Sequence, residues 1–136
     1  MARKTQPKKQ GLKLKRDASR ILRTVGEEKA FYFYSAIGEP TGEKAASLLA
    51  FSDKVKTVKL ESLRFHLRRK DFHNWLETTI GDSRLARKIR VMRSLRDAKL
   101  RRKMSVAIEA RIRELSEETG LSISVNEDLI LTSTSW

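Results

Sequence analysis

Positive charge is concentrated in two short segments of this chain and is not spread along its 136 residues. The chain has 30 Lys and Arg residues against 17 Asp and Glu residues, which gives a net charge of +13. Residues 84–103 contribute +9 and residues 1–25 contribute +8, whereas residues 26–83 are neutral and residues 104–136 carry −4. Because charged side chains are seldom buried without partners, both basic segments must place most of these side chains on the surface. The pattern predicts a neutral folded body with two basic elements attached to it.

Length and composition exclude several classes of protein. A chain of this length is typical of one domain with a modest core. It has no run of about 18 apolar residues, so a membrane-spanning helix is not expected, and its basic N-terminus lacks the apolar region of a secretory signal. It contains no cysteine, which excludes disulfides, thiolate catalysis and cysteine-based metal sites. We therefore expect an intracellular, cytoplasmic protein that does not associate with membranes.

Local patterns predict a mainly α-helical domain at residues 17–119. Residues 1–16 lack acidic and aromatic side chains and are expected to form a flexible basic arm. A short helix is predicted from Asp17 to Val25, and the aromatic run at residues 30–37 predicts an extended segment. Residues 38–42 contain two glycines and a proline and predict a turn, after which Thr41 is expected to cap a helix that continues to Val55.

The second half of the chain predicts three more helices and a C-terminal extension. One helix is expected at about residues 60–69, and another from Asp71 to Gly81. Asp82 is expected to cap a long basic helix at residues 83–118, about 54 Å long at 1.5 Å per residue. Since this length exceeds the diameter of so small a body, the helix must project or break, and the change of charge sign favours a break after Lys103. Residues 120–136 predict a hairpin or an added edge strand.

The basic part of the predicted long helix indicates an anionic partner. Apolar side chains recur every three to four positions from Leu85 to Met104, so one side is expected to pack on the body and the other to present cations. Seven of the ten cations are Arg, whose guanidinium groups bind phosphate oxygens in pairs. Ten like charges without partners repel one another, so an anionic partner explains the pattern better than a solvated helix face does. The residues predicted to bind nucleic acid are Arg3, Lys4, Lys8, Lys9, Lys13, Lys15, Arg16, Arg84, Arg87, Lys88, Arg90, Arg93, Arg96, Lys99, Arg101, Arg102 and Lys103.

The predicted mode of binding is contact with the phosphate backbone, largely without base-specific readout. The basic segment has no Asn or Gln to address adenine edges, and no turn of known spacing marks a recognition helix. Eight aromatic residues could form a stacking platform for single strands, but their spacing in the neutral body favours a place in the core. These residues are Phe31, Tyr32, Phe33, Tyr34, Phe51, Phe65, Phe72 and Trp75.

Three other patterns are less specific. His66, His73 and Glu77 have metal-ligand spacing on a continuous helix, but the break expected near Asp71 separates them. Residues 38–44 resemble a phosphate-binding loop, yet they depart from its spacing and lack the Ser or Thr that should follow Lys44. Ser, His and Asp are present without the context that identifies a catalytic triad. We therefore expect no catalytic residues, no metal, no cofactor and no enzymatic activity.

A set of residues between positions 31 and 89 forms a pattern of its own. It consists of Phe31-Tyr32-Phe33, Gly38, Thr41-Gly42, Ala46-Ser47-Leu48, Phe51, Glu61-Ser62-Leu63-Arg64-Phe65-His66, Asp71-Phe72, Trp75, Gly81-Asp82, Leu85-Ala86 and Ile89. This pattern, which covers under half of the chain, resembles a small archaeal domain family of uncharacterised function. The resemblance implies a compact neutral body and brings no activity or cofactor with it. The basic arm and the C-terminal part of the long helix lie outside it.

Together these patterns predict a non-enzymatic protein that binds the phosphate backbone of duplex DNA or of structured, ribosomal RNA. Two settings fit, a chromatin-like protein of the nucleoid and a ribosome-associated protein, and the sequence does not separate them. The alternative is a protein-interaction module or a self-associating homo-oligomer that uses the acidic C-terminal part and the basic helix. The acidic residues of that part are Glu109, Glu114, Glu117, Glu118, Glu127 and Asp128.

Overall fold

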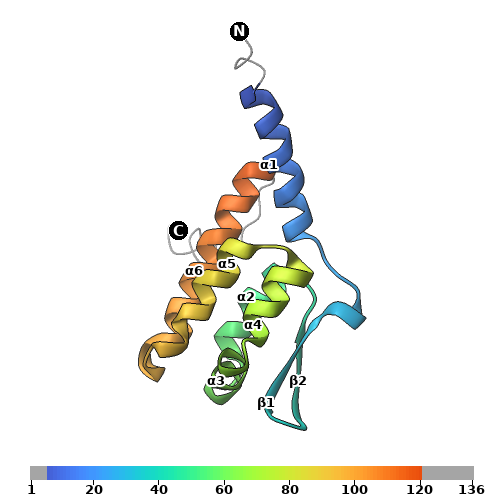
Figure 1. Ribbon diagram of the computed structural model, residues 1–136. Coiled ribbons are helices and arrows are strands. Elements are labelled where there is room, and N and C mark those ends of the chain that lie inside the picture. The colour runs from blue at the N-terminus through green and yellow to red at the C-terminus, as the bar shows by residue number, and fades with distance from the viewer. Residues whose placement is uncertain (1–5, 121–136) are drawn as a thin grey trace, which may run out of the picture.

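The computed structural model describes the backbone of residues 6–120 and the side chains of residues 11–120. It confirms a mainly helical protein, to which a two-stranded antiparallel sheet is added (Figure 1). No helix in this range is long and apolar enough to cross a membrane. In chain order the elements are α1 (Gln6–Leu22), the 3-10 turn η2 (Glu27–Lys29), β1 (Phe31–Ala36), β2 (Glu39–Ala45), α2 (Leu48–Thr57), α3 (Leu60–Arg69), α4 (Asp71–Asn74), the π-helical turn η3 (Trp75–Ile80), α5 (Ser83–Arg90), the 3-10 turn η4 (Val91–Ser94) and α6 (Asp97–Thr119).

Helix α1 begins much earlier than expected. The prediction of a flexible arm is wrong for residues 6–16, which are helical, while residues 1–5 lie outside the described range. Ala18 and Ile21 are buried and α1 contacts α6, so the C-terminal half is anchored to the body. Extending an anchored helix toward its N-terminus needs no new nucleus, and Pro7 is tolerated because it lies in the first turn. The N-terminal part of α1 therefore projects beyond the body (Figure 1).

The aromatic run forms a strand as predicted, but the next segment is a strand and not a helix. β1 and β2 pair with Phe31 opposite Ala45. The Thr41 hydroxyl donates to the Phe33 carbonyl at 2.8 Å and accepts from the Glu43 N–H at 3.1 Å, so Thr41 closes the hairpin and caps no helix. Residues 38–44 accordingly form the hairpin turn and most of β2, which is not the strand-to-helix context of a phosphate-binding loop.

The helix after the hairpin starts later than predicted, at Leu48. Its N-cap is Ser47, whose hydroxyl accepts the Ala50 N–H at 3.1 Å. The helix predicted at about residues 60–69 is confirmed as α3, and the helical stretch from Asp71 ends at Gly81 as expected, although its second part is the π-helical turn η3.

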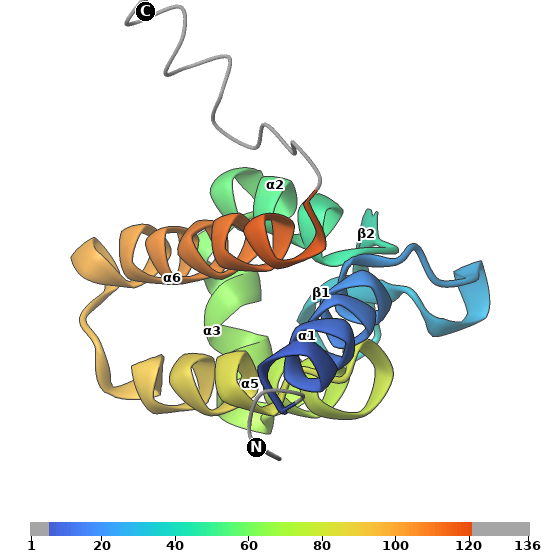
Figure 2. The same ribbon diagram turned by 90° about the horizontal axis from the view of Figure 1, so that it is seen from above.

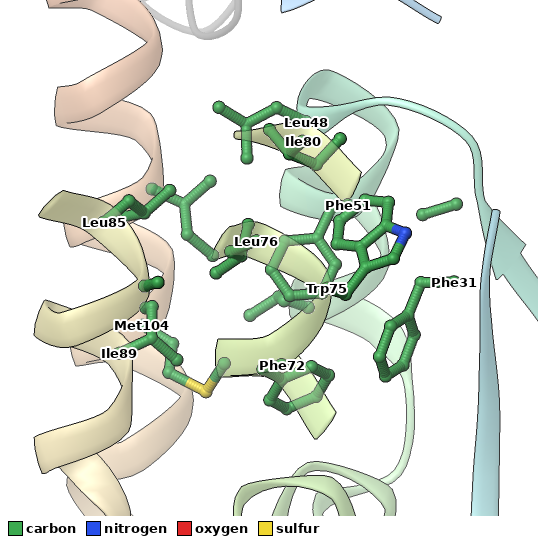
Figure 3. Close-up of a cluster of buried hydrophobic side chains, with 14 of the residues drawn as sticks. Phe31, Leu48, Phe51, Phe72, Trp75, Leu76, Ile80, Leu85, Ile89 and Met104 are labelled. Atoms are coloured by element: carbon green, nitrogen blue, oxygen red, sulfur yellow. The ribbon is translucent and has the colours of Figure 1, made fainter. Parts of the chain in front are cut away.

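The hydrophobic core lies where the hairpin, α2 and η3 meet α5 and α6. Phe31, Phe51 and Phe72 are buried together with Trp75, and Met104 of α6 reaches the same cluster (Figure 3). The rings of Phe51 and Phe72 pack edge to face at 5.2 Å between centroids. The prediction that the aromatic residues belong to the core is thus confirmed for most of them, but Tyr32 is 44% exposed.

The predicted long basic helix is two helices, α5 and α6. Their connection contains η4 and the extended residues Leu95 and Arg96. The break therefore lies before Lys103, whereas the sequence favoured a break after it. Both helices have a buried side, which includes Ile89 in α5 and Leu100 in α6. A single straight helix could not turn both buried sides toward one core. The connection instead reverses the direction of the chain, and this reversal places α5 beside α6 (Figure 2). The C-terminal hairpin predicted at residues 120–136 falls almost wholly outside the described residues.

Arg64 of α3 holds the reversal in place. Its guanidinium donates to Asp97 Oδ1 at 2.6 Å, to the Arg93 carbonyl at 3.1 Å and to the Leu95 carbonyl. The two carbonyls belong to the end of η4 and to the extended linker, where no helical N–H is available to them. One side chain therefore satisfies the backbone of the linker and the first residue of α6.

We expect the Arg64→Ala variant to lose about 1–3 kcal/mol of unfolding free energy, because the three acceptors lose their donor in a partly buried setting. Urea denaturation followed by circular dichroism measures this loss. Arg68→Ala is the matched control, since Arg68 lies one turn further along α3, is exposed and makes no hydrogen bond or ion pair with the described residues. It should change stability by less than about 0.5 kcal/mol. Equal losses in both variants would show that Arg64 does not hold the linker.

Candidate nucleic-acid interface

Helix α5 presents a row of cations because its apolar residues fix its orientation. Asp82 caps the helix by accepting the Leu85 N–H at 3.2 Å, as the sequence predicted. Leu85, Ala86 and Ile89 then face the core. The remaining positions point away from it and are exposed, and four of them are cations. These are Arg84, Arg87, Lys88 and Arg90.

The row continues through η4 onto the first turns of α6. Arg93 and Arg96 are exposed in the connection. Lys99 and Lys103 are exposed on α6 at positions that share one helix stripe with Ala110. Ala110 borders a 430 Å³ groove between α5 and α6, on whose other wall Arg84, Arg87 and Lys88 lie. Lys99 and Lys103 therefore stand on the side of α6 that faces α5.

We call these eight residues the basic surface: Arg84, Arg87, Lys88, Arg90, Arg93, Arg96, Lys99 and Lys103. All eight are exposed, and none forms an ion pair with any described residue. The only carboxylate of this segment, Asp97, is bound by Arg64. The fold thus leaves these charges uncompensated, which is the arrangement that a polyanion would neutralise.

A buried ion pair fixes α5 against α6 beneath the basic surface. Asp82 is 2% exposed, and its Oδ2 accepts from Arg111 Nε at 2.7 Å, while Arg111 also donates to Glu114 Oε1 at 2.6 Å. Burial disfavours the charged form of Arg111, but the bonds to Asp82 and Glu114 outweigh it and raise the Arg111 pKa above its ordinary value. Asp82 therefore serves both helices, as N-cap of α5 and as partner of α6.

The second basic segment meets the first at the start of α5. Lys13, Lys15 and Arg16 are exposed on α1. A 260 Å³ recess is lined by Arg20 of α1 and by Arg84 of α5, so the two segments are contiguous. Of the other predicted residues, Arg3 and Lys4 lie outside the described range, and only the backbone of Lys8 and Lys9 is described.

Two predicted contact residues do not share this surface. Arg101 is half-buried and donates to the Val55 carbonyl of α2 at 2.9 Å, so it ties α6 to α2. Arg102 lines a separate recess with Lys56 and Leu60. Both residues point away from α5 because they fall on other stripes of α6 once the long helix is broken.

Arg68 and Lys70, at the end of α3, were not among the predicted contact residues. Both are exposed, and neither has an ion-pair partner among residues 11–120. Arg64 contacts η4, which lies in the connection between α5 and α6, the α5–α6 corner. Arg68 lies one turn further along the same side of α3, so this helix extends the basic surface away from that corner. The three consecutive cations at residues 68–70 were the available signal, which the neutral charge of residues 26–83 obscured.

Of the three residues with metal-ligand spacing, His66 makes other contacts, whereas His73 and Glu77 contact each other. His66 Nε2 accepts the Tyr34 N–H at 2.8 Å, and His66 Nδ1 lies 2.8 Å from Asp71 Oδ2. His73 Nε2 is 2.7 Å from Glu77 Oε1. In the part of the chain that the structure describes, no three His, Asp or Glu side chains come together as metal ligands.

The His66 environment predicts a dependence of stability on pH. Burial lowers its pKa below the ordinary value, and Arg69 acts in the same direction, although the bond to Asp71 opposes both. Below about pH 6.5 the unfolded chain therefore binds a proton at His66 more readily than the folded chain, and stability falls as the pH falls. Urea unfolding at pH 7.5 and pH 5.5 should show this loss. In His66→Gln the difference between the two pH values should shrink, and an unchanged difference would assign it to other groups.

The acidic residues of the alternative interaction module are partly used inside the fold. Glu109 pairs with Lys56, and Glu114 pairs with Arg111. Glu117 and Glu118 lie at the end of α6, whereas Glu127 and Asp128 lie outside the described residues. Two of the six carboxylates thus have partners within the chain, which leaves a smaller acidic surface than the sequence predicted.

Comparison of the chain with protein-family models, with curated proteins and with solved structures found no match. The resemblance of residues 31–89 to an archaeal domain family therefore stays a prediction.

Proposed function

We propose that this protein is a nucleic-acid-binding protein that contacts the phosphate backbone of duplex DNA or structured RNA through the basic surface and α1. The observation that carries the proposal is the absence of any carboxylate, among residues 11–120, bound to the eight exposed cations of the basic surface. A face designed only for solubility would alternate signs and gain from ion pairs along the helix. A polyanion supplies the negative charge that compensates these cations, and it releases its own counterions on binding.

The composition of the basic surface supports backbone contact more than base readout. Arg and Lys bind phosphate oxygens, and five of the eight residues are Arg, whose planar forks match phosphate geometry. Residues 84–103, which form this surface, include no Asn or Gln for adenine edges. It also extends over α5, η4 and α6 and is not confined to the N-terminal residues of one helix, as in a recognition helix.

The salt dependence of binding tests this proposal. Fluorescence anisotropy with a labelled DNA duplex and a labelled RNA hairpin should show tight binding at 50 mM salt. If six to ten phosphates are contacted, the affinity should fall about 10³- to 10⁵-fold between 50 and 200 mM salt. The affinities for the labelled DNA and for the labelled RNA decide which of the two nucleic acids the protein prefers. A complex whose affinity does not change with salt, or no complex at 50 mM salt with either label, would contradict the proposal.

A further inference from the structure

A recess of 490 Å³ lies on the hairpin side of the molecule, between β1 and the helical segment α3–α4–η3. Its volume is in the range of about 300–1,000 Å³ that is typical of small-ligand pockets. Tyr32, Tyr34, Phe65 and Trp75 line it. The basic surface and the proposed phosphate contacts leave this recess unexplained.

The walls of the recess offer aromatic surface in a fixed position. Tyr32 is 44% exposed, and its hydroxyl donates to the Glu27 carbonyl at 2.7 Å. Trp75 donates to the Lys29 carbonyl at 2.8 Å, and Phe65 is half-buried. The guanidinium of Arg69 lies over the Phe65 ring, 5.1 Å from its centroid, and forms a planar cationic extension of the wall. The rings of Tyr32 and Phe65 are partly exposed, and Trp75 is buried except for 7% of its surface. Flat rings held in this way suit a planar aromatic ligand better than an aliphatic one.

The recess also contains polar groups that the fold does not use. Asn74 is exposed, and neither its side-chain amide nor the Tyr34 hydroxyl has a hydrogen-bond partner among the described residues. One oxygen of Asp71 binds His66 and Arg69, and the other oxygen has no partner within residues 11–120. These groups provide both donors and acceptors around an aromatic site. A heteroaromatic ring with a hydrogen-bonding edge would satisfy them, which a plain hydrocarbon could not do.

The recess is adjacent to cations that connect it to the basic surface. Arg69 lines it, and the exposed cations Arg68 and Lys70 flank Arg69 at the end of α3. The same helix contacts η4 through Arg64, so α3 runs from the α5–α6 corner to the recess. A nucleic-acid strand that follows the basic surface therefore meets further cations before it reaches the aromatic site.

We propose that this recess binds an unpaired nucleobase of the nucleic acid that the basic surface holds. This inference rests on the proposed function and deepens it, because it makes a folded RNA or DNA with a single-stranded nucleotide a better ligand than a fully paired duplex. The ring stacks on the aromatic wall, while Asn74, Tyr34 and Asp71 face its polar edge. Arg68 and Lys70 contact the flanking phosphates.

Trp75 provides a direct reporter for this test. The chain has two tryptophans, so the Trp136→Phe variant leaves Trp75 as the only one. This protein is titrated with a fully paired RNA duplex and with a duplex of equal phosphate number that has a three-nucleotide single-stranded end. We expect the second RNA to quench Trp75 emission and to bind about tenfold more tightly, with a similar salt slope, because one stacked base contributes an effect of about this size.

Substitutions of Phe65 separate the aromatic contribution from the phosphate contacts. Phe65→Leu should bind both RNAs with the affinity that the unsubstituted protein has for the fully paired duplex. Phe65→Tyr should keep the preference for the RNA with the single-stranded end, since it retains the ring. Equal affinity of the unsubstituted protein for both RNAs, or a preference that survives in Phe65→Leu, overturns the inference while the proposed function stands. If neither RNA binds, the proposed function fails. Titration with nucleoside monophosphates then tests whether the recess binds a nucleobase. Quenching by AMP or GMP but not by ribose 5-phosphate supports a base site, and no quenching overturns it.

Discussion

Neutralising three cations of α5 should weaken nucleic-acid binding about 100-fold at 150 mM salt. The variant is Arg84→Gln with Arg87→Gln and Arg90→Gln, which removes three exposed charges and keeps long side chains with good helix propensity. Each lost phosphate contact lowers the salt slope by about 0.9, so the three together should lower it by about 2.7. Anisotropy titrations at several salt concentrations measure both quantities. Circular dichroism should show an unchanged fold, because none of the three side chains bonds to another described residue.

A matched control removes the same charge from the hairpin side. Lys29, Lys44 and Lys59 are exposed and lie at or near the hairpin. Among residues 11–120, Lys44 pairs with the exposed Glu27, and the other two have no ion-pair partner. Substituting all three with Gln lowers the net charge by the same amount as the α5 variant. We expect this control to reduce the salt slope by less than one contact. If both variants weaken binding equally, the protein acts through its net charge, and the basic surface has no special role.

Replacing Asp82 with Ala should destabilise the fold by about 3–5 kcal/mol. The change removes the N-cap of α5 and leaves the Arg111 guanidinium, whose side chain is 13% exposed, without its buried partner. Urea denaturation measures the loss. Nucleic-acid binding should weaken as well, because the cations of α5 lose their fixed position over α6.

Two further variants separate the functions of Asp82. Asp82→Ser keeps an N-cap oxygen and loses the charge pair, so it should be about 1 kcal/mol more stable than Asp82→Ala. Asp82→Ala combined with Arg111→Met removes both charges and should lose less stability than Asp82→Ala alone, because the double variant leaves no guanidinium without its buried partner. Strictly additive losses in the double variant would show that the pair is not coupled.

The parts of the fold that were predictable from the sequence depend on local chemistry. Asp82 as an N-cap and Gly81 at a helix end were correct because a short acceptor and a left-handed glycine, here with φ of 92°, act within a few residues. Thr41 was misassigned because a hydroxyl serves a hairpin as well as a helix cap. The choice between them depends on the partner strand, which carries the Phe33 carbonyl.

The sequence left open whether the long helix projects or breaks, and the position of the break between α5 and α6 was not predictable from local signals. Neither Gly nor Pro occurs between residues 83 and 119, and the extended residues Leu95 and Arg96 are stabilised by Arg64, more than 30 positions earlier in the chain. The candidate site likewise combines residues that a local pattern places with residues that depend on contacts far apart in the sequence. The exposed cations of α5 followed from the helical pattern, whereas the separation of Arg101 from them follows from the reversal and from its bond to Val55.

Arginine footprinting shows directly whether nucleic acid covers the basic surface. Phenylglyoxal modifies exposed arginines, and mass spectrometry compares the rate at each site with and without bound nucleic acid at low salt. We expect strong protection of Arg84, Arg87, Arg90, Arg93 and Arg96. Arg113 should not be protected, because it is also exposed on α6 and has no ion-pair partner among the described residues, but lies outside the basic surface. Protection of Arg113 to the same degree, or unchanged modification of the five surface arginines in a complex shown to be bound, would contradict it.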